Sequence, residues 1–205
     1  MDEHYAININ RQICSGARTV AGIIAKELGI SVYDKTLLKS ASDASGFRRE
    51  FFAKSDEETS RKSLRSLFLT HLTEGGLSHN YMSNESMFKL QGDAIRDIHA
   101  RENCIFIGRC ASYILRDSDR ILNVFLTADA EDRIRRVCST RQCTERQARN
   151  LIEDADRKRA SYFNYFTGRN WGDAATYHLC LSTSAFSEEE CAGIILNIAR
   201  KKLGI

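Results

Sequence analysis

The stretch Cys14-Ser15-Gly16-Ala17-Arg18-Thr19 is the part of the sequence that decides the fold. It follows an apolar run over residues 5–9 that is typical of a strand, and it opens a segment over residues 18–28 with helical periodicity. A tight loop of small residues between a strand and a helix directs backbone N–H groups and a helix N-terminus toward an anion. The stretch therefore predicts a phosphate-binding loop.

This loop departs from the full phosphate-loop pattern, G-x-x-x-x-G-K-[ST]. Gln12 and Ala17 replace the two glycines, and Arg18 replaces the lysine. Thr19 matches the last position, so its hydroxyl is predicted to hold Mg²⁺. The alternative interpretation is an ordinary strand-to-helix turn in which Ser15 is the helix N-cap.

Length and composition favour one α/β domain in the cytoplasm. The chain has 205 residues, a formal net charge of +3, and no apolar run as long as a membrane span. The sequence pI near 8.5 is only mildly basic, so no nucleic acid is expected as a partner. The seven cysteines stand at no metal-type spacing and predict reduced thiols, and the polar N-terminus does not resemble a signal peptide.

Apolar periodicity predicts an alternation of strands and helices. Short apolar runs predict strands at residues 5–9, 30–34, 104–107, 121–126 and 177–181. Helical patterns, two of them opened by the capping boxes Thr144-x-x-Gln147 and Ser187-x-x-Glu190, cover residues 18–28, 85–101, 129–137, 144–166 and 187–202. We expect a doubly wound parallel sheet in a three-layer α/β/α domain over residues 1–205, with a helical insert at 36–102. The insert carries a helical stripe of Leu64, Leu67, Phe68 and Leu72.

Two polar groups follow predicted strands, where ligands of such folds sit. Asp34 ends the second strand and is suited to accept a proton, bind a substrate group or hold metal-bound water. Gly108-Arg109 ends the third strand, where the guanidinium can grip a phosphate with two N–H bonds. The alternatives are a helix N-cap for Asp34 and an ordinary surface position for Arg109.

Arginines are dense between residues 133 and 159. Arg133 and Arg136 lie three apart on one helix face, and Asp156 is spaced to form an ion pair that aims Arg159. Phosphoryl transfer needs cations that close on phosphate oxygens, and residues 138–143 are polar enough to form a mobile cover. The alternative is a solvated charged face for most of these arginines. The aromatic segment 161–172 is expected to pack on the core.

Together these stretches resemble the cytidylate kinase-like family of P-loop nucleoside monophosphate kinases, close to bacterial CMP kinase. The family opens with S-R-x-x-G-S-G-G-R, which reads N-R-Q-I-C-S-G-A-R at residues 10–18. Its Y-D-K element is present at residues 33–35 and its G-R-C-A strand end at 108–111. Residues 156–172 are close to the family's long D-x-x-R-A-x-Y-x-x-Y-x-T-G-x-x-W-G stretch.

The resemblance implies ATP-dependent phosphoryl transfer, with Mg²⁺, to a nucleoside monophosphate or a similar small acceptor. It implies catalytic roles for Arg18, Asp34 and Arg159, acceptor binding by Asp34, Arg109 and Asp156, and a lid at about 138–147 flanked by Arg133 and Arg136. It implies phosphate binding by the loop residues Ser15, Gly16, Ala17, Arg18 and Thr19. The partner is expected to be a small-molecule nucleotide, and the chain a monomer or homodimer.

The insert at 36–102 differs from the acceptor-binding insert of CMP kinase, so the resemblance does not carry cytidine specificity. Cys14 and Ala17 occupy positions where the family has glycine. A methyl group at Ala17 is expected to obstruct a phosphate or to conflict with a positive φ angle. The altered loop therefore favours a second hypothesis, a weak or inactive nucleotide- or anion-binding protein that retains the kinase fold.

Overall fold

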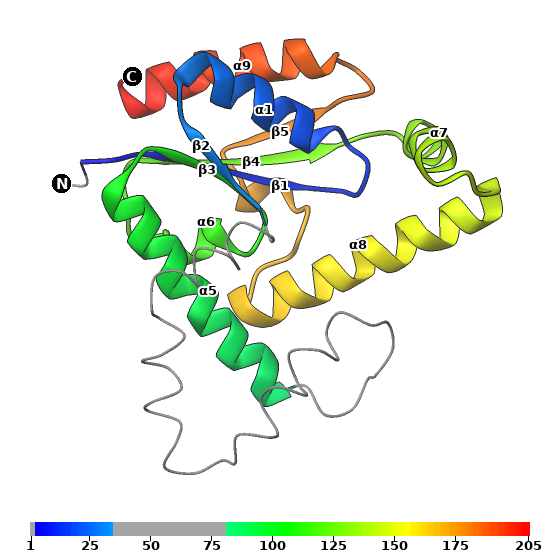
Figure 1. Cartoon of the computed structure of the whole chain (residues 1–205), viewed down its shortest axis with the longest axis horizontal. Coiled ribbons are helices and arrows are strands. Elements are labelled where there is room, and N and C mark those ends of the chain that lie inside the picture. Colours follow the sequence, from blue (N-terminus) through cyan, green and yellow to red (C-terminus); the bar gives the residue numbers. More distant parts are fainter. Residues whose placement is uncertain (1–2, 35–80) are drawn as a thin grey trace.

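The computed structural model describes residues 3–34 and 81–205, with only the backbone described for 81–84. Five strands form one parallel sheet in the order β2-β3-β1-β4-β5 (Figure 1). The strand bounds are β1 Ala6–Arg11, β2 Ser31–Tyr33, β3 Cys104–Ile107, β4 Ile121–Thr127 and β5 Leu179–Ser182. Strands β1, β3 and β4 are almost entirely buried because helices cover both faces of the sheet.

Helices α1 (Ala17–Leu28) and α9 (Glu188–Leu203) cover one face of the sheet (Figure 1). The other face carries α5 (Tyr81–Arg101), the short α6 (Ala111–Ile114) and the C-terminal half of α8 (Glu145–Thr167). Side chains of alternate strand residues enter the two cores, since successive residues of a strand point to opposite faces. The doubly wound three-layer architecture predicted from the sequence is confirmed.

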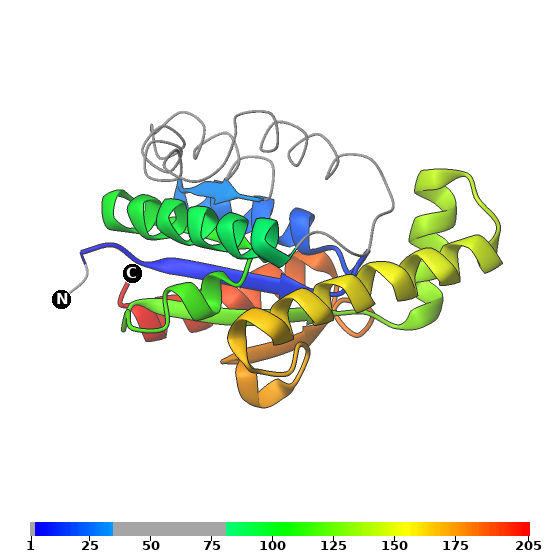
Figure 2. The ribbon, with the colours of Figure 1, turned by 90° about the horizontal axis from the view of Figure 1, so that it is seen from below.

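Helix α7 (Ala130–Arg141) and the N-terminal half of α8 form an arm beyond the carboxyl ends of the strands (Figure 2). They pack on each other through Ile134, Val137, Ala148 and Ile152, which form a small cluster separate from the two main cores. The predicted capping boxes at Thr144 and Ser187 are both present. Residues 138–147, where the sequence predicts a lid, comprise the last residues of α7, the turn at 142–144 and the first residues of α8.

The predicted elements match the observed ones with shifted ends. The last strand begins at Leu179, two residues later than expected, because the 3₁₀ turn η1 (Ala174–Thr176) leads into it. The helix predicted to begin near residue 85 begins at Tyr81, and the helix expected over 129–137 extends to Arg141. The stripe from Leu64 to Leu72 lies outside the described residues. Among the described residues, no helix combines the length and the apolar character that a membrane span requires.

Candidate functional site

The phosphate-loop candidate joins β1 to α1 at the carboxyl edge of the sheet. Gly16, with a φ of 70°, is the residue that caps α1, and no side chain caps the helix. Ser15 is therefore not the N-cap of the alternative interpretation; its hydroxyl donates instead to the Gln12 carbonyl at 3.0 Å. Because the first N–H groups of a helix lack intrahelical partners, an uncapped N-terminus here is suited to an anion.

The two glycine replacements differ in their conformations. Ala17 is the first residue of α1, outside the positive-φ region, and its side chain is buried in the core beneath the loop. The expected conflict at Ala17 is therefore wrong, because its methyl group packs against the core. Cys14 has a φ of 58°, a left-handed conformation that favours glycine, so the strain in this loop lies at Cys14.

Gln12, which replaces the first glycine of the pattern, connects the loop to β4. Its backbone N–H donates to the Leu126 carbonyl at 3.0 Å. Its side-chain oxygen accepts from the Thr127 hydroxyl and from the Ala128 N–H, the latter at 3.3 Å. The sequence did not indicate this role, because the partners lie more than a hundred residues away along the chain.

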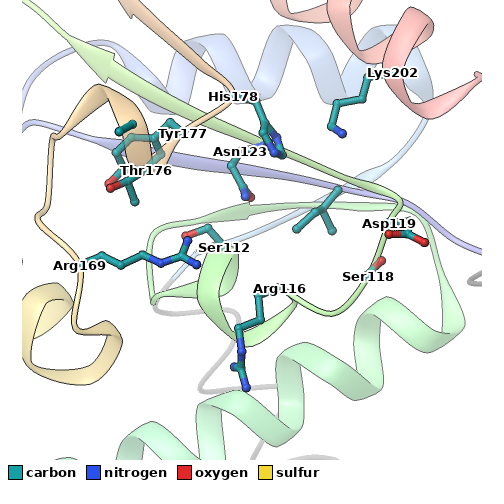
Figure 3. A pocket seen from close by; sticks show the side chains of 12 residues that line it. Ser112, Arg116, Ser118, Asp119, Asn123, Arg169, Thr176, Tyr177, His178 and Lys202 are labelled. Carbon is teal, nitrogen blue, oxygen red and sulfur yellow. Dashed lines mark hydrogen bonds between the residues drawn. The ribbon is translucent and has the colours of Figure 1, made fainter.

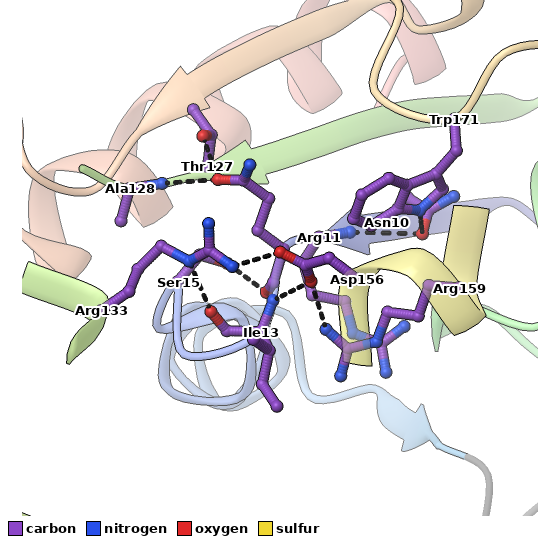
Figure 4. A network of polar contacts seen from close by, with 11 residues as sticks. Asn10, Arg11, Ile13, Ser15, Thr127, Ala128, Arg133, Asp156, Arg159 and Trp171 are labelled. Carbon is purple, nitrogen blue, oxygen red and sulfur yellow. Dashed lines mark hydrogen bonds and ion pairs between the residues drawn. The ribbon is translucent and has the colours of Figure 1, made fainter. Parts of the chain in front are cut away.

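A network of polar contacts connects the loop to the arm formed by α7 and α8 (Figure 4). The Ile13 N–H donates to Asp156 Oδ1 at 2.8 Å, and the Ile13 carbonyl accepts from Arg133 Nε at 2.9 Å. Arg133 and Asp156 also form an ion pair, in which their side chains are 8% and 15% exposed. Arg159 joins the same carboxylate at 3.4 Å, as its spacing from Asp156 predicts.

Arg136 reaches the loop one residue further along. Its guanidinium donates to the Cys14 carbonyl at 3.1 Å and lies 3.6 Å from the Glu188 carboxylate. Glu188 also lies against Gly16, where an added Cβ would come within 2.2 Å of its carboxylate oxygen. Gly16 is thus required both by its φ and by this neighbour, which the sequence had not indicated.

Four arginines gather at the carboxyl ends of β1 and β3. Arg11 and Arg109 each stand two residues beyond the paired positions Ile9 and Ile107 of these adjacent strands. Burial, followed by the charges of Arg159, Arg109 and Arg18, lowers the pKa of Arg11 to about 9. Burial also lowers the pKa of Arg159. We call Arg11, Arg18, Arg109 and Arg159 the arginine cluster.

Arg11 is a candidate site residue that the sequence interpretation missed, although it matches the arginine of the family's opening pattern. Its guanidinium passes directly over Gly108, where an added Cβ would come within 2.0 Å of Nη1. Gly108, Arg109 and Cys110 are consecutive left-handed residues, with φ of 74°, 59° and 56°. This turn brings Arg109 to the Tyr162 ring, with its guanidinium carbon 5.9 Å from the centroid. In the described part of the chain, no hydrogen bond or ion pair engages the Arg11 guanidinium.

Asp34, like Asp156, is a carboxylate that pairs with a member of the arginine cluster. It pairs with Arg18 at 3.1 Å, where the Arg18 side chain is 81% exposed and that of Asp34 is 22% exposed. The helix that Asp34 was alternatively expected to cap would begin at residue 35, outside the described residues. Thr19 lies exposed in the first turn of α1. A single exposed hydroxyl and one nearby carboxylate fit Mg²⁺ that is held mainly by nucleotide phosphates.

Other expectations concern packing and metal ligation. The aromatic segment packs on the core as expected: Phe166 stacks on Phe88 at 4.2 Å, and Trp171 meets Phe125 edge-on at 5.2 Å. All seven cysteines are free thiols. Within residues 3–34 and 81–205, no group of three or more His, Cys, Asp or Glu side chains is arranged to hold a metal ion.

Comparison with known proteins gives a family and a fold. The model of the cytidylate kinase-like family matches residues 6–185. An uncharacterized protein from Eubacterium ventriosum ATCC 27560 has a similar structure, with 21% identity, a TM-score of 0.72, and coverage of 96% of this chain and 98% of that chain. Shikimate kinase from Bacteroides thetaiotaomicron matches with 11% identity, a TM-score of 0.49, and coverage of 95% and 97%. No curated protein matches the sequence.

Proposed function

We propose that this chain, which belongs to the cytidylate kinase-like family, transfers a phosphoryl group from ATP to a CMP-like nucleoside monophosphate or a similar small acceptor. The observation that carries the proposal is the arginine cluster beside an uncapped helix N-terminus. The charge of the buried Arg11 guanidinium is costly to hold without a bound anion, because three other arginines surround it and carboxylates of the described residues pair with only two of those three. Phosphoryl transfer needs such an arrangement, since its transition state spreads negative charge over several oxygens.

On the donor side, the loop residues Ser15 to Thr19 hold the ATP phosphates. The free N–H groups at the start of α1 face the anion, and Arg18 supplies the charge that lysine supplies in the full pattern. Thr19 and Asp34 are the residues that would hold Mg²⁺, directly or through water. When bound, Mg²⁺ neutralises charge on the phosphate oxygens.

On the acceptor side, Arg109 and Arg11 hold the acceptor's own phosphate at the ends of β3 and β1. Asp34 orients Arg18 through their ion pair and meets the acceptor group. Asp156 acts through Arg159, whose guanidinium it holds against the loop. An acceptor phosphate is already ionised at neutral pH, so the residues mainly position and neutralise rather than remove a proton.

The arm supplies the remaining cations. Arg133 and Arg136 hold the carbonyls of Ile13 and Cys14, so the position of α7 and the shape of the loop are linked. We propose that this link lets the arm serve as the lid, with Arg159 closing on the transferred group. A lid that excludes water protects the donor from hydrolysis.

The second candidate function, a weak or inactive nucleotide-binding protein, is favoured by the conformation of Cys14. A non-glycine residue at a φ of 58° strains the loop at a position where the family has glycine. This candidate keeps ligand binding and loses turnover, so binding and catalysis must be measured separately.

The test combines thermal stability and turnover. A ligand that binds the native state raises the melting temperature, so ATP–Mg²⁺ and one monophosphate from a panel should each do so. Arg159→Gln should lower kcat by about a hundredfold or more, and Arg157→Gln, an exposed neighbour on the same helix, should leave it within about twofold. Stabilisation without turnover would support the second candidate. No stabilisation by any nucleotide at millimolar concentration would overturn both.

A further inference from the structure

A separate cavity of about 340 Å³ lies at the opposite edge of the sheet from the phosphate loop (Figure 3). It opens at the amino ends of β4 and β5, where Ile121, Asn123 and His178 contribute to its lining. Its volume falls within the range of small-molecule sites, roughly 300–1,000 Å³. Nothing in the proposed phosphoryl transfer uses this cavity.

Hydrogen-bond donors dominate its lining. The Asn123 backbone N–H donates to His178 Nδ1 at 3.0 Å, so the proton of the neutral imidazole is on Nε2 and is available to a ligand. Burial, followed by the nearby charge of Lys202, lowers the pKa of His178, which keeps the ring neutral at pH 7. The buried Ser112 hydroxyl and Asn123 amide add further polar groups to the wall.

Two cations of this cavity, Arg169 and Lys202, have no ion-pair partner among the described residues. Within the described chain, the side chains of Arg169 and Lys202 make no hydrogen bond or ion pair, and they come from the loop after α8 and from α9. Arg116 also lines the cavity, but its guanidinium is held by the Tyr113 carbonyl at 3.0 Å and over the Tyr113 ring at 4.5 Å. The lining thus holds three cationic side chains against one carboxylate, that of Asp119.

The arrangement of these groups suits an anionic group that is part of a small organic molecule. Figure 3 shows Arg169 and Asp119 on opposite sides of the cavity, with Asn123 and His178 between them. A phosphate near Asn123 would receive charge-assisted hydrogen bonds from Arg169 and Lys202 and a further bond from His178. Asp119 remains to accept a hydrogen bond from a hydroxyl group of the same molecule.

We propose that this cavity is a binding site for a small hydroxyl-bearing organic phosphate, distinct from the site at the phosphate loop. The contribution of each cation can be tested singly, because Arg169 and Lys202 are both exposed and their replacement leaves no buried charge unpaired. Lys201 is the matched control, since it is an exposed lysine of the same helix outside the cavity lining.

The experiment follows the imidazole signals of the full-length protein by NMR, with the His178 signal assigned through His178→Gln. The probes are inorganic phosphate and glycerol 3-phosphate, and sodium chloride at equal ionic strength is the reference. Both phosphates should shift the His178 signal saturably, and glycerol 3-phosphate should bind more tightly. Arg169→Gln and Lys202→Met should each weaken binding by about tenfold or more, the usual effect of losing a charge-assisted hydrogen bond.

Lys201→Met should bind as the wild type does. Arg18→Gln, which alters the phosphate loop, should leave the His178 titration within about twofold, so failure here is distinct from failure of the proposed kinase activity. A shift that chloride reproduces, wild-type affinity in both cavity variants, or a loss confined to Arg18→Gln would each overturn the proposal. Equal affinity for inorganic phosphate and glycerol 3-phosphate would show that the site does not recognise the hydroxyl-bearing part of the ligand.

Discussion

The backbone N–H of Ile13 donates a hydrogen bond to Asp156 Oδ1 at 2.8 Å, although 143 residues separate them. The same carboxylate pairs with Arg133, whose Nε donates to the carbonyl of Ile13 at 2.9 Å. Both backbone polar groups of one loop residue, Ile13, are therefore held by side chains from the arm. This relationship makes the shape of the phosphate loop depend on where α7 and α8 sit, which a local sequence motif does not reveal.

Asp156→Asn should destabilise the fold strongly. The substitution leaves the buried guanidinium of Arg133 without its ionic partner, and breaking a buried pair in this way costs about 3 kcal/mol. In a chain of this size the melting temperature should fall by about 6–12 °C. Asp154→Asn, which breaks an exposed pair with Arg157 on the same helix, should change the free energy of unfolding by less than about 0.5 kcal/mol. Equal melting temperatures for the two variants would contradict a structural role for the contacts of Asp156 with Arg133 and Ile13.

Cys14→Gly and Ala17→Gly should have opposite effects on stability. The left-handed conformation of Cys14 costs energy that glycine avoids, so Cys14→Gly should be neutral or should stabilise the fold by up to about 1 kcal/mol. It should also raise any turnover that the strain in the loop suppresses. Ala17 is helical and buried, so glycine there should cost about 1 kcal/mol. Chemical denaturation of both variants checks the contrast. Stabilisation by Ala17→Gly would show that the strain lies at Ala17 and not at Cys14.

Gly16→Ala should destabilise the loop by two separable effects. The φ of 70° disfavours any side chain by roughly 1 kcal/mol, and the added Cβ displaces the Glu188 carboxylate. Combining it with Glu188→Ala should remove the steric part only, which a double-mutant cycle measures. Gly22→Ala is the control, because Gly22 lies exposed in α1 with open space around it and should gain about 0.5–1 kcal/mol. An additive cycle would show that Glu188 and Gly16 are not coupled.

Arg11→Gln should stabilise the ligand-free protein while weakening nucleotide binding. The pKa of Arg11 is lowered to about 9, so the group is still charged at pH 7, but holding that charge in the folded state costs stability. Removing that charge should raise the free energy of unfolding by about 1 kcal/mol, because residues kept for function often destabilise the folded protein. Thermal unfolding with and without ATP–Mg²⁺ gives both effects. Destabilisation together with unchanged nucleotide affinity would remove Arg11 from the site.

The same pKa gives a pH dependence. Above about pH 9 the folded state releases the Arg11 proton while the unfolded state keeps its own, so the unfolded state binds more protons and Arg11 contributes increasing stability as the pH rises. Nucleotide affinity should fall over the same range, because the site loses a positive charge. Stability and affinity measured from pH 7 to 10 should show this change in the wild type and lack it in Arg11→Gln. A parallel profile in both proteins would assign the change to other groups.

Sequence patterns predicted most of the fold because they report local preferences. Unbroken apolar runs at residues 104–107 and 121–126 marked buried parallel strands, and the S/T-x-x-E/Q pattern located two helix starts correctly. The start of the last predicted strand was less accurate because η1 precedes it and Tyr177 packs against Phe125, a tertiary contact. Spacing alone also predicted the ion pair between Asp156 and Arg159.

By itself the sequence determined the class of fold, the family and the place of the candidate phosphate loop, since these depend on periodicity and short motifs. Only the tertiary structure decided which residues surround the loop. Gln12, Arg11 and Glu188 gain their roles from partners brought close by the parallel crossovers of the sheet, and the strain at Cys14 rather than Ala17 depends on backbone angles. The physical reason is that chain folding, not sequence distance, sets which charges and hydrogen-bonding groups meet.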